Sequence, residues 1–183
     1  KNLVDALVAT EDERFYEHSG IDGRGTLRAI VSLGTSGGAS TLTQQLAKQL
    51  FHGEGSKFLP FRIVQKIKEW IIAIRLERQY TKNEIIAMYC NVYDFGNYSV
   101  GVSSAAQTYF SKAPKDLTID ESAILVGMFK NSGLYNPVKN PQGVKNRRNV
   151  VLSQMEKGGI ITEGQKEKLQ ALPITLKFKL ESH

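Results

Sequence analysis

Apolar residues recur with a helical period along most of the chain. Leu3, Val4, Leu7 and Val8 fall at i, i+1, i+4 and i+5, a spacing typical of the buried face of a helix. Similar patterns predict helices over residues 3–11, 26–33, 41–51, 62–79, 82–89, 100–110 and 119–130, and one more after Thr162. We therefore expect a mainly α-helical fold that forms a single domain over residues 1–183.

Local signals mark where several of these helices begin. In a capping box, a threonine and the acid or amide three residues later satisfy each other's backbone N–H groups. Three pairs have this spacing: Thr81 with Glu84, Thr118 with Glu121, and Thr162 with Gln165. Only residues 174–180 alternate apolar and polar side chains, which predicts a strand. We interpret residues 174–183 as a connector to a downstream domain.

The helix predicted over residues 41–51 has two distinct faces. Leu42, Leu46 and Leu50 form an apolar stripe. A second face carries a hydroxyl, two amides and an ammonium group, from Thr41, Gln44, Gln45 and Lys48. This polar face is either an ordinary solvated surface or a binding surface, and the pattern alone favours neither.

The long helix predicted over residues 62–79 repeats this arrangement. Its predicted buried stripe consists of Ile67, Trp70, Ile71 and Ile74. Lys66 and Glu69 are i, i+3 neighbours, so they form either a surface ion pair or part of a cleft that contains a second acid.

Positive charge is concentrated in the middle of the chain. The 183 residues carry a net charge of +6, and residues 48–82 hold eight Lys or Arg against three Glu. Such a patch suits nucleic acid, anionic lipid or a pyrophosphate substrate. Residues 51–63 mix aromatic, aliphatic and basic side chains, so they either form a satellite of the core or enter a membrane interface. No apolar run reaches the ~18–20 residues of a membrane span.

Chemically active side chains are densest at residues 11–20, which read Glu-Asp-Glu-Arg-Phe-Tyr-Glu-His-Ser-Gly. Glu11 follows the apolar helix at 3–11, and a carboxylate held against an apolar wall can serve as a base. The alternative is a charged helix end whose acids are solvated. We expect Cys90 in the core, and three scattered histidines with one cysteine do not predict a structural zinc site.

Taken together, five stretches resemble the motifs of the glycosyltransferase domain of penicillin-binding proteins and monofunctional peptidoglycan glycosyltransferases (family 51). They are residues 11–20, Gly-Ala-Ser-Thr-Leu-Thr-Gln-Gln-Leu-Ala-Lys at 38–48, Gln-Lys-Ile-Lys-Glu at 65–69, residues 82–91, and residues 125–137 followed by Arg-Arg-Asn at 147–149. The chain departs from the family pattern at Gln65, Gln49, Asp94 and Cys90. Arg62, one turn before Gln65, is a candidate replacement for the missing arginine.

The resemblance implies a lysozyme-like helical head with a smaller, membrane-facing jaw at about residues 51–66. It implies that the 4-hydroxyl of lipid II attacks a lipid-linked glycan chain, with inversion to a β-1,4 linkage and release of undecaprenyl pyrophosphate. The implied partners are lipid II, the growing chain, the membrane interface on the extracytoplasmic (periplasmic) face of a bacterial cell, and inhibitors of the moenomycin type, but no nucleic acid.

The resemblance also assigns roles to individual residues. Glu11 and Glu69 are the catalytic acids, with Glu11 the general base and Glu69 holding the lysines or a divalent cation such as Mg²⁺. No organic cofactor is implied. The implied substrate-binding residues are Ser40, Thr41, Gln44, Gln45, Lys48, Lys66, Arg62 and Asn91. The residues expected to order the first motif are Asp12, Phe15, His18 and Gly20.

Two other functions share some of these features. A lysozyme-like hydrolase would use two carboxylates but gives no reason for Lys48 and Lys66. A non-enzymatic basic module at a membrane or on nucleic acid would explain the charge, although aromatic residues are not interleaved with it as base stacking requires.

Overall fold

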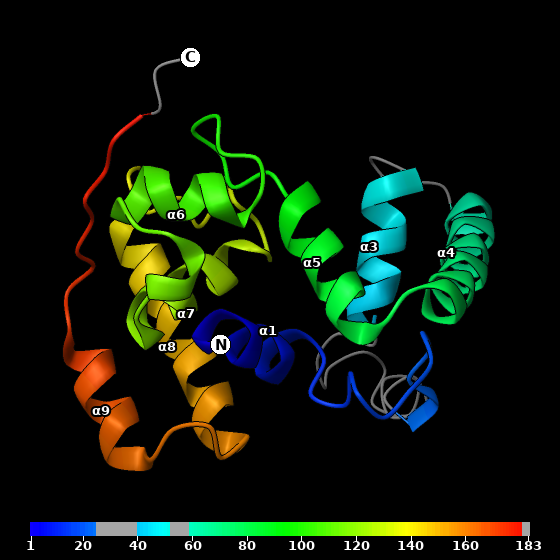
Figure 1. Cartoon of the computed structure of the whole chain (residues 1–183), viewed down its shortest axis with the longest axis horizontal. Helices are drawn as coiled ribbons and strands as arrows, with labels where there is room; N and C mark the ends of the chain where they lie inside the picture. Colours follow the sequence, from blue (N-terminus) through cyan, green and yellow to red (C-terminus); the bar gives the residue numbers. More distant parts are fainter. Residues whose placement is uncertain (25–39, 52–58, 181–183) are drawn as a thin grey trace. The chain divides into compact units, whose positions relative to one another are not determined.

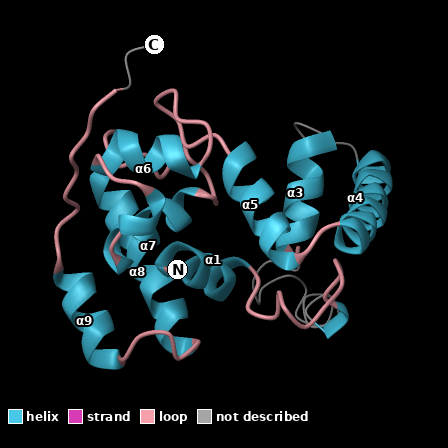
Figure 2. Ribbon diagram, viewed as in Figure 1, coloured by secondary structure: helices cyan, strands magenta, loops and turns pink. Residues whose placement is uncertain are grey.

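The computed structural model describes residues 1–24, 40–51 and 59–180. The chain divides into two compact units, one of residues 1–13 and 93–183 and the other of residues 14–92. The described chain is mainly helical and contains no strand, which confirms the predicted fold class (Figures 1 and 2). The helix predicted at 26–33 lies outside the described residues. The head and jaw arrangement stays a prediction.

The first unit is built around one almost completely buried helix. Helix α7 (Ile119–Met128) buries every residue from Ser122 to Met128. It packs against α1 (Asn2–Glu11) and α8 (Pro141–Lys157), and α8 also contacts α9 (Glu163–Ala171) (Figure 1). Helix α6 (Val102–Phe110) and a short 3₁₀ helix, η1 (Pro114–Asp116), complete the unit. Because α7 is buried on all sides from Ser122 onward, it forms the core onto which α1 packs.

The predicted capping boxes are all present. Thr118 with Glu121 and Thr162 with Gln165 make both reciprocal bonds. The backbone N–H of Thr81 donates to Glu84 at 2.8 Å, and Glu84 N–H donates back to the Thr81 hydroxyl at 3.3 Å. These boxes begin α7, α9 and α5 (Lys82–Val92).

Helix α8 was not predicted from the apolar pattern. Its first turn is instead fixed by Asn140, whose side-chain oxygen accepts the Gly143 N–H at 3.0 Å, and by Pro141 at the first helical position. Four apolar residues of this mostly polar helix are buried, namely Val144, Val151, Leu152 and Met155.

The prediction of a strand at 174–180 is wrong, although the backbone there is extended. The N–H groups of Lys177 and Lys179 donate to the carbonyls of Tyr109 and Thr108, at 2.9 and 2.8 Å. These carbonyls belong to the last turn of α6, where a helix leaves its C=O groups without intrahelical partners. The alternating segment therefore pairs with the end of a helix and not with a sheet.

The second unit contains α3 (Leu42–Phe51), α4 (Leu59–Gln79) and α5, with α3 packed on both other helices. In α3 the apolar stripe is buried at Leu42 and Leu46, whereas Leu50 at the end of the same stripe is exposed. Within the described parts of the chain, no helix is both long and apolar enough to cross a membrane.

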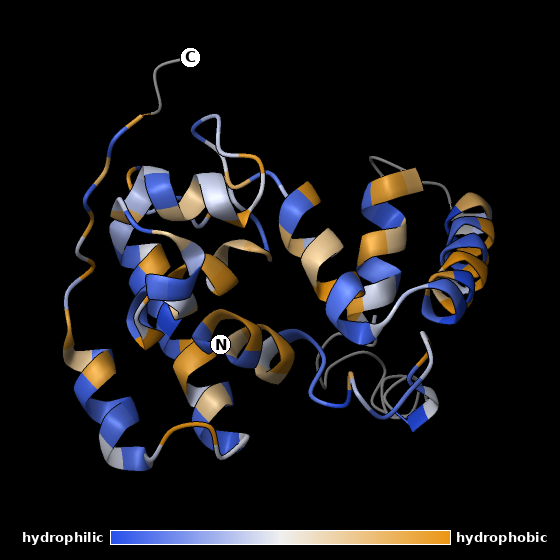
Figure 3. Cartoon of the chain, viewed as in Figure 1, coloured by the Kyte–Doolittle hydropathy of each residue, from blue (hydrophilic) through white to orange (hydrophobic). Residues whose placement is uncertain are grey.

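The prediction of which face of α4 is buried is wrong. Ile67 and Ile71 are 48% and 49% exposed, while the buried positions are Glu69, Ala73 and Leu76. Figure 3 shows apolar segments alternating with polar ones along α4. The spacing of apolar residues predicted a helix correctly, but the face that meets α3 contains the acid Glu69.

Candidate functional site

A lysine, a serine and a buried acid come together in the second unit. The Lys66 ammonium donates to the Ser40 hydroxyl at 2.7 Å and to Glu69 at 3.2 Å. The Glu69 side chain is 8% exposed, whereas that of Lys66 is 37% exposed. The structure thus brings together three sequence-predicted residues, and it fixes a cation that solvent or a ligand can still reach.

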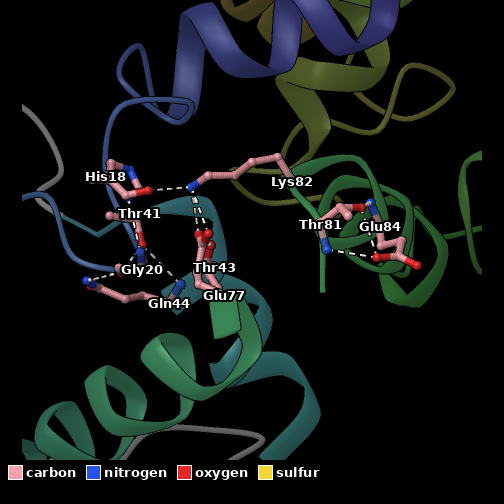
Figure 4. A network of polar contacts seen from close by, with 9 residues as sticks. All are labelled: His18, Gly20, Thr41, Thr43, Gln44, Glu77, Thr81, Lys82 and Glu84. Carbon is pink, nitrogen blue, oxygen red and sulfur yellow. Dashed lines mark hydrogen bonds and ion pairs between the residues drawn. The ribbon is translucent and has the colours of Figure 1, made fainter. Parts of the chain in front are cut away.

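The first residues of α3 form a buried network around Gly20. The Thr41 hydroxyl accepts the Gln44 N–H at 3.2 Å, which makes Thr41 the N-cap of α3. The Thr41 hydroxyl and the Gln44 amide both donate to the Gly20 carbonyl, at 2.8 and 3.1 Å (Figure 4). Both side chains are buried. They hold the end of the first motif in place, and their predicted contact with substrate stays a prediction.

Gly20 is required where it stands. Its φ is +91°, and a Cβ atom there would lie 2.9 Å from the backbone carbon and oxygen of Ala73 in α4. Only glycine adopts this conformation without strain and allows such a close backbone approach. The first motif therefore ends in tight contact with α4.

Lys82 of α5 also contacts the first motif, at Phe15 and His18. Its ammonium donates to the His18 carbonyl at 2.6 Å, pairs with Glu77 at 2.8 Å, and lies 4.3 Å from the centre of the Phe15 ring. Glu77 also accepts the Thr43 hydroxyl at 2.6 Å (Figure 4). Phe15, His18 and Gly20 are therefore positioned by residues of α3, α4 and α5 and by the N-cap Thr41. That they order the motif for catalysis stays a prediction.

The predicted general base lies in the first unit, at the C-terminal end of α1. Glu11 Oε1 is 3.1 Å from Nη2 of Arg147, and the two side chains are 17% and 12% exposed. Tyr93 lies near enough for the negative charge of Glu11 to act on it. Burial first, and then the charges of Glu11 and Asp94, raise the pKa of Tyr93, so its phenol stays neutral and donates to the Met128 carbonyl at 2.6 Å.

The remaining predicted residues lie in varied surroundings. Lys48, Arg62 and Asn91 are exposed. Gln45 accepts the Tyr89 hydroxyl at 2.8 Å through its side-chain oxygen, and Asp12 is buried. As expected, Cys90 is in the core, where burial raises the pKa of its thiol to about 12.

The described residues do not fit a divalent cation held by the protein alone. Within 1–24, 40–51 and 59–180, no three His, Cys, Asp or Glu side chains are grouped to hold a metal ion. A cation beside Glu69 would also meet the ammonium of Lys66, which already pairs with that carboxylate.

Three residues that shape these sites were not assigned a role from the sequence. Glu77 gave no signal of its own. Lys82 and Arg147 lie within stretches that match the fourth and fifth motifs, so the motif match could have pointed to them. Their partners His18 and Glu11 are 64 and 136 residues away along the chain, and local patterns do not reveal such pairs.

Comparison with known proteins agrees with the motif resemblance. The family model described as "Transglycosylase" matches residues 1–156. The chain is 41% identical to penicillin-binding protein 1A of Vibrio cholerae, over 97% of this chain and 22% of that protein. It is 40% identical to penicillin-binding protein 1F of Bacillus subtilis, over 100% of this chain and 25% of that protein.

A solved structure gives the same picture. The crystal structure of penicillin-binding protein 1A from Haemophilus influenzae matches with a TM-score of 0.50 and 31% identity, over 74% of this chain and 17% of that one. The chain spans about a quarter or less of the length of these relatives. The chain belongs to the transglycosylase family and is a peptidoglycan glycosyltransferase domain of the kind that class A penicillin-binding proteins contain.

Proposed function

We propose that this domain polymerises lipid II, with Glu11 as the general base. Glu11 takes the proton of the 4-hydroxyl as that oxygen forms a bond to the anomeric carbon of the lipid-linked chain. The bond from this carbon to the pyrophosphate oxygen breaks, undecaprenyl pyrophosphate leaves with both electrons, and the configuration inverts. To act as the base, the carboxylate of Glu11 must lie within hydrogen-bond reach of the attacking hydroxyl.

The observation that carries the proposal is the fixed position of Lys66. A departing pyrophosphate needs positive charge more than it needs a proton, because its oxygens are already anionic. Lys66 is held by Ser40 and by the buried Glu69, yet more than a third of its side chain is exposed. It can therefore meet the leaving group without first being ordered. Lys48, exposed on α3, supplies a second cation, and an inhibitor of the moenomycin type would compete for both.

The exposed face of α4 supports a membrane-facing role for this unit. Five large apolar residues of α4 are about half exposed or more, namely Phe61, Ile63, Val64, Ile67 and Ile71. Arg62, Lys68 and Arg75 are exposed on the same helix. Apolar side chains interspersed with cations suit the boundary between the acyl chains and anionic headgroups, where lipid II would be presented at the outer face of the cell membrane.

A substitution at Glu11 tests the assignment of the base. Glu11→Gln keeps the size of the side chain and removes the proton acceptor, so polymerisation of lipid II should fall by at least about 10²-fold while lipid II still binds. Product length on a gel and binding to lipid II in detergent micelles measure the two effects. Polymerisation at the parental rate would overturn the assignment, and release of fragments from finished glycan would indicate a hydrolase instead.

A matched pair of lysines tests the assignment of the cations. Lys48→Ala should reduce polymerisation far more than Lys68→Ala, because only Lys48 is assigned to the pyrophosphate, whereas Lys68 is one of several exposed cations of α4. Both variants lose one positive charge, so a general effect of net charge would reduce both rates equally. Equal losses would therefore contradict the role of Lys48.

A further inference from the structure

We propose that Arg147 is the positioning residue for Glu11, and that Gly127 makes the space that lets it act. This inference rests on the proposed function, because it assigns Arg147 a part in the same reaction. All three residues belong to the first unit, so the argument depends only on contacts within it.

The end of α1 is an unfavourable place for a carboxylate. The C-terminal end of a helix carries partial negative charge, which repels an acid there and attracts a base. Glu11 is the last residue of α1, and the last turn of α1 contains no basic residue. The positive charge is supplied by Arg147 of α8, 136 residues later, whose Nη2 lies 3.1 Å from Glu11 Oε1.

The guanidinium is held from a second direction. Arg147 Nε donates to the Gly127 carbonyl of α7 at 3.4 Å. Arg147 thus joins the ends of α7 and α1, and its planar group fixes the direction from which it approaches the carboxylate. Because both side chains are largely buried, this contact is less weakened by water than a surface ion pair.

Gly127 is needed for this path. A Cβ atom at Gly127 would lie 3.0 Å from Cγ and 3.7 Å from Cβ of Arg147. Glycine in the interior of a helix is less stable than alanine, so a glycine inside α7 points to a packing requirement at this position. Here the aliphatic stem of Arg147 occupies the space that a side chain would take.

The neighbouring Arg148 provides an internal control. It is fully buried, lies 3.0 Å from Asp120, and donates to the carbonyls of Gln170 and Leu172 at 3.1 and 2.9 Å. Those carbonyls lie at the end of α9, so Arg148 joins α8 to α7 and α9 and has no described contact with Glu11. Two adjacent arginines therefore have separable roles, one at the site and one in the fold.

The test compares Arg147→Met, Arg147→Lys, Arg147→Ala and Arg148→Met in lipid II polymerisation and thermal unfolding. Lys157→Gln, at a lysine whose side chain is 68% exposed, is the control and should change neither kcat nor Tm appreciably. We expect Arg147→Met to lower the kcat of the folded protein about 10- to 100-fold with KM within about twofold, as for residues that orient a reacting group. It should also lower Tm, because it removes one partner of a largely buried ion pair. Arg147→Lys should recover part of kcat, and added guanidinium ion should raise the kcat of Arg147→Ala. Arg148→Met should lower Tm and leave the kcat of the folded protein unchanged.

Gly127→Ala keeps the experiment informative if Arg147→Met fails to fold. This variant retains the charge and displaces only the arginine stem, so kcat should fall and added guanidinium should not restore it. The inference is overturned if Glu11→Gln is inactive while Arg147→Met polymerises at the parental rate, or if kcat falls only in proportion to folded protein. If Glu11→Gln itself stays active, it is the proposed function that fails.

Discussion

Replacement of Lys82 by methionine removes the cation that fastens the first motif. The Glu77 side chain is 5% exposed and that of Lys82 is 23% exposed, and Lys82 also donates to the His18 carbonyl at 2.6 Å. Removing one partner of a buried ion pair typically costs ~3–5 kcal/mol. Water reaches Lys82 in part, so we expect Lys82→Met to lower the free energy of unfolding by about 2–3 kcal/mol.

A double-mutant cycle isolates the ion pair. Glu77→Gln keeps an acceptor for Thr43 and removes the charge that Lys82→Met leaves unpaired. The double variant should therefore be more stable than the sum of the two single losses, by about 1–2 kcal/mol. Trp70 is the one tryptophan of the chain and lies in the same unit, so its fluorescence during urea unfolding reports on this unit.

Lys68→Met is the control for this cycle. Lys68 is exposed on α4, and its loss should change the free energy of unfolding by less than about 0.5 kcal/mol. Strictly additive losses at Glu77 and Lys82 would refute the reasoning, because they would mean that the two side chains contribute independently.

Three further predictions follow from single contacts. Gly20→Ala should destabilise the second unit by more than ~1 kcal/mol in urea unfolding, because the φ of +91° and the 2.9 Å approach to the Ala73 backbone leave no place for a methyl group. An unchanged midpoint of urea unfolding would contradict this. Burial raises the pKa of Cys90 to about 12, so iodoacetamide at pH 8 should modify the thiol only after unfolding, as mass spectrometry would show. Burial opposes ionisation of Glu121, but bonds from Lys112 outweigh it and lower the pKa of Glu121 below 4.5. The stability that this provides is present above pH 4.5 and is lost as the pH falls through the lowered pKa, so Glu121→Gln should destabilise at pH 7 and progressively less toward pH 3.

Features that depend on neighbouring residues were predicted well. The boxes that begin α5, α7 and α9 involve groups three residues apart, and all three are present. The helical period also located α3 and α4, since it depends only on spacing along the chain.

Features that depend on distant partners were predicted less well. Spacing alone gave the wrong buried face for α4, because the face is chosen by the surface of α3 and by the backbone at Gly20. The spacing also placed Thr41 and Gln44 on a polar face of the helix that would meet solvent or a ligand. In the structure both side chains are buried and donate hydrogen bonds to the Gly20 carbonyl. The pairing of Arg147 with Glu11 depends on how α8 packs against α1, which the sequence pattern does not specify.

The extended segment at 174–180 has a consequence for how the domain can be shortened. Its two bonds to the last turn of α6 come from main-chain N–H groups, so replacing side chains one at a time would leave both in place. A proteolytic cut before Lys177 would instead remove both donors at once, so that the Thr108 and Tyr109 carbonyls would accept hydrogen bonds only from water. A trimmed version of the domain that is meant to keep α6 intact should therefore extend at least to Lys179.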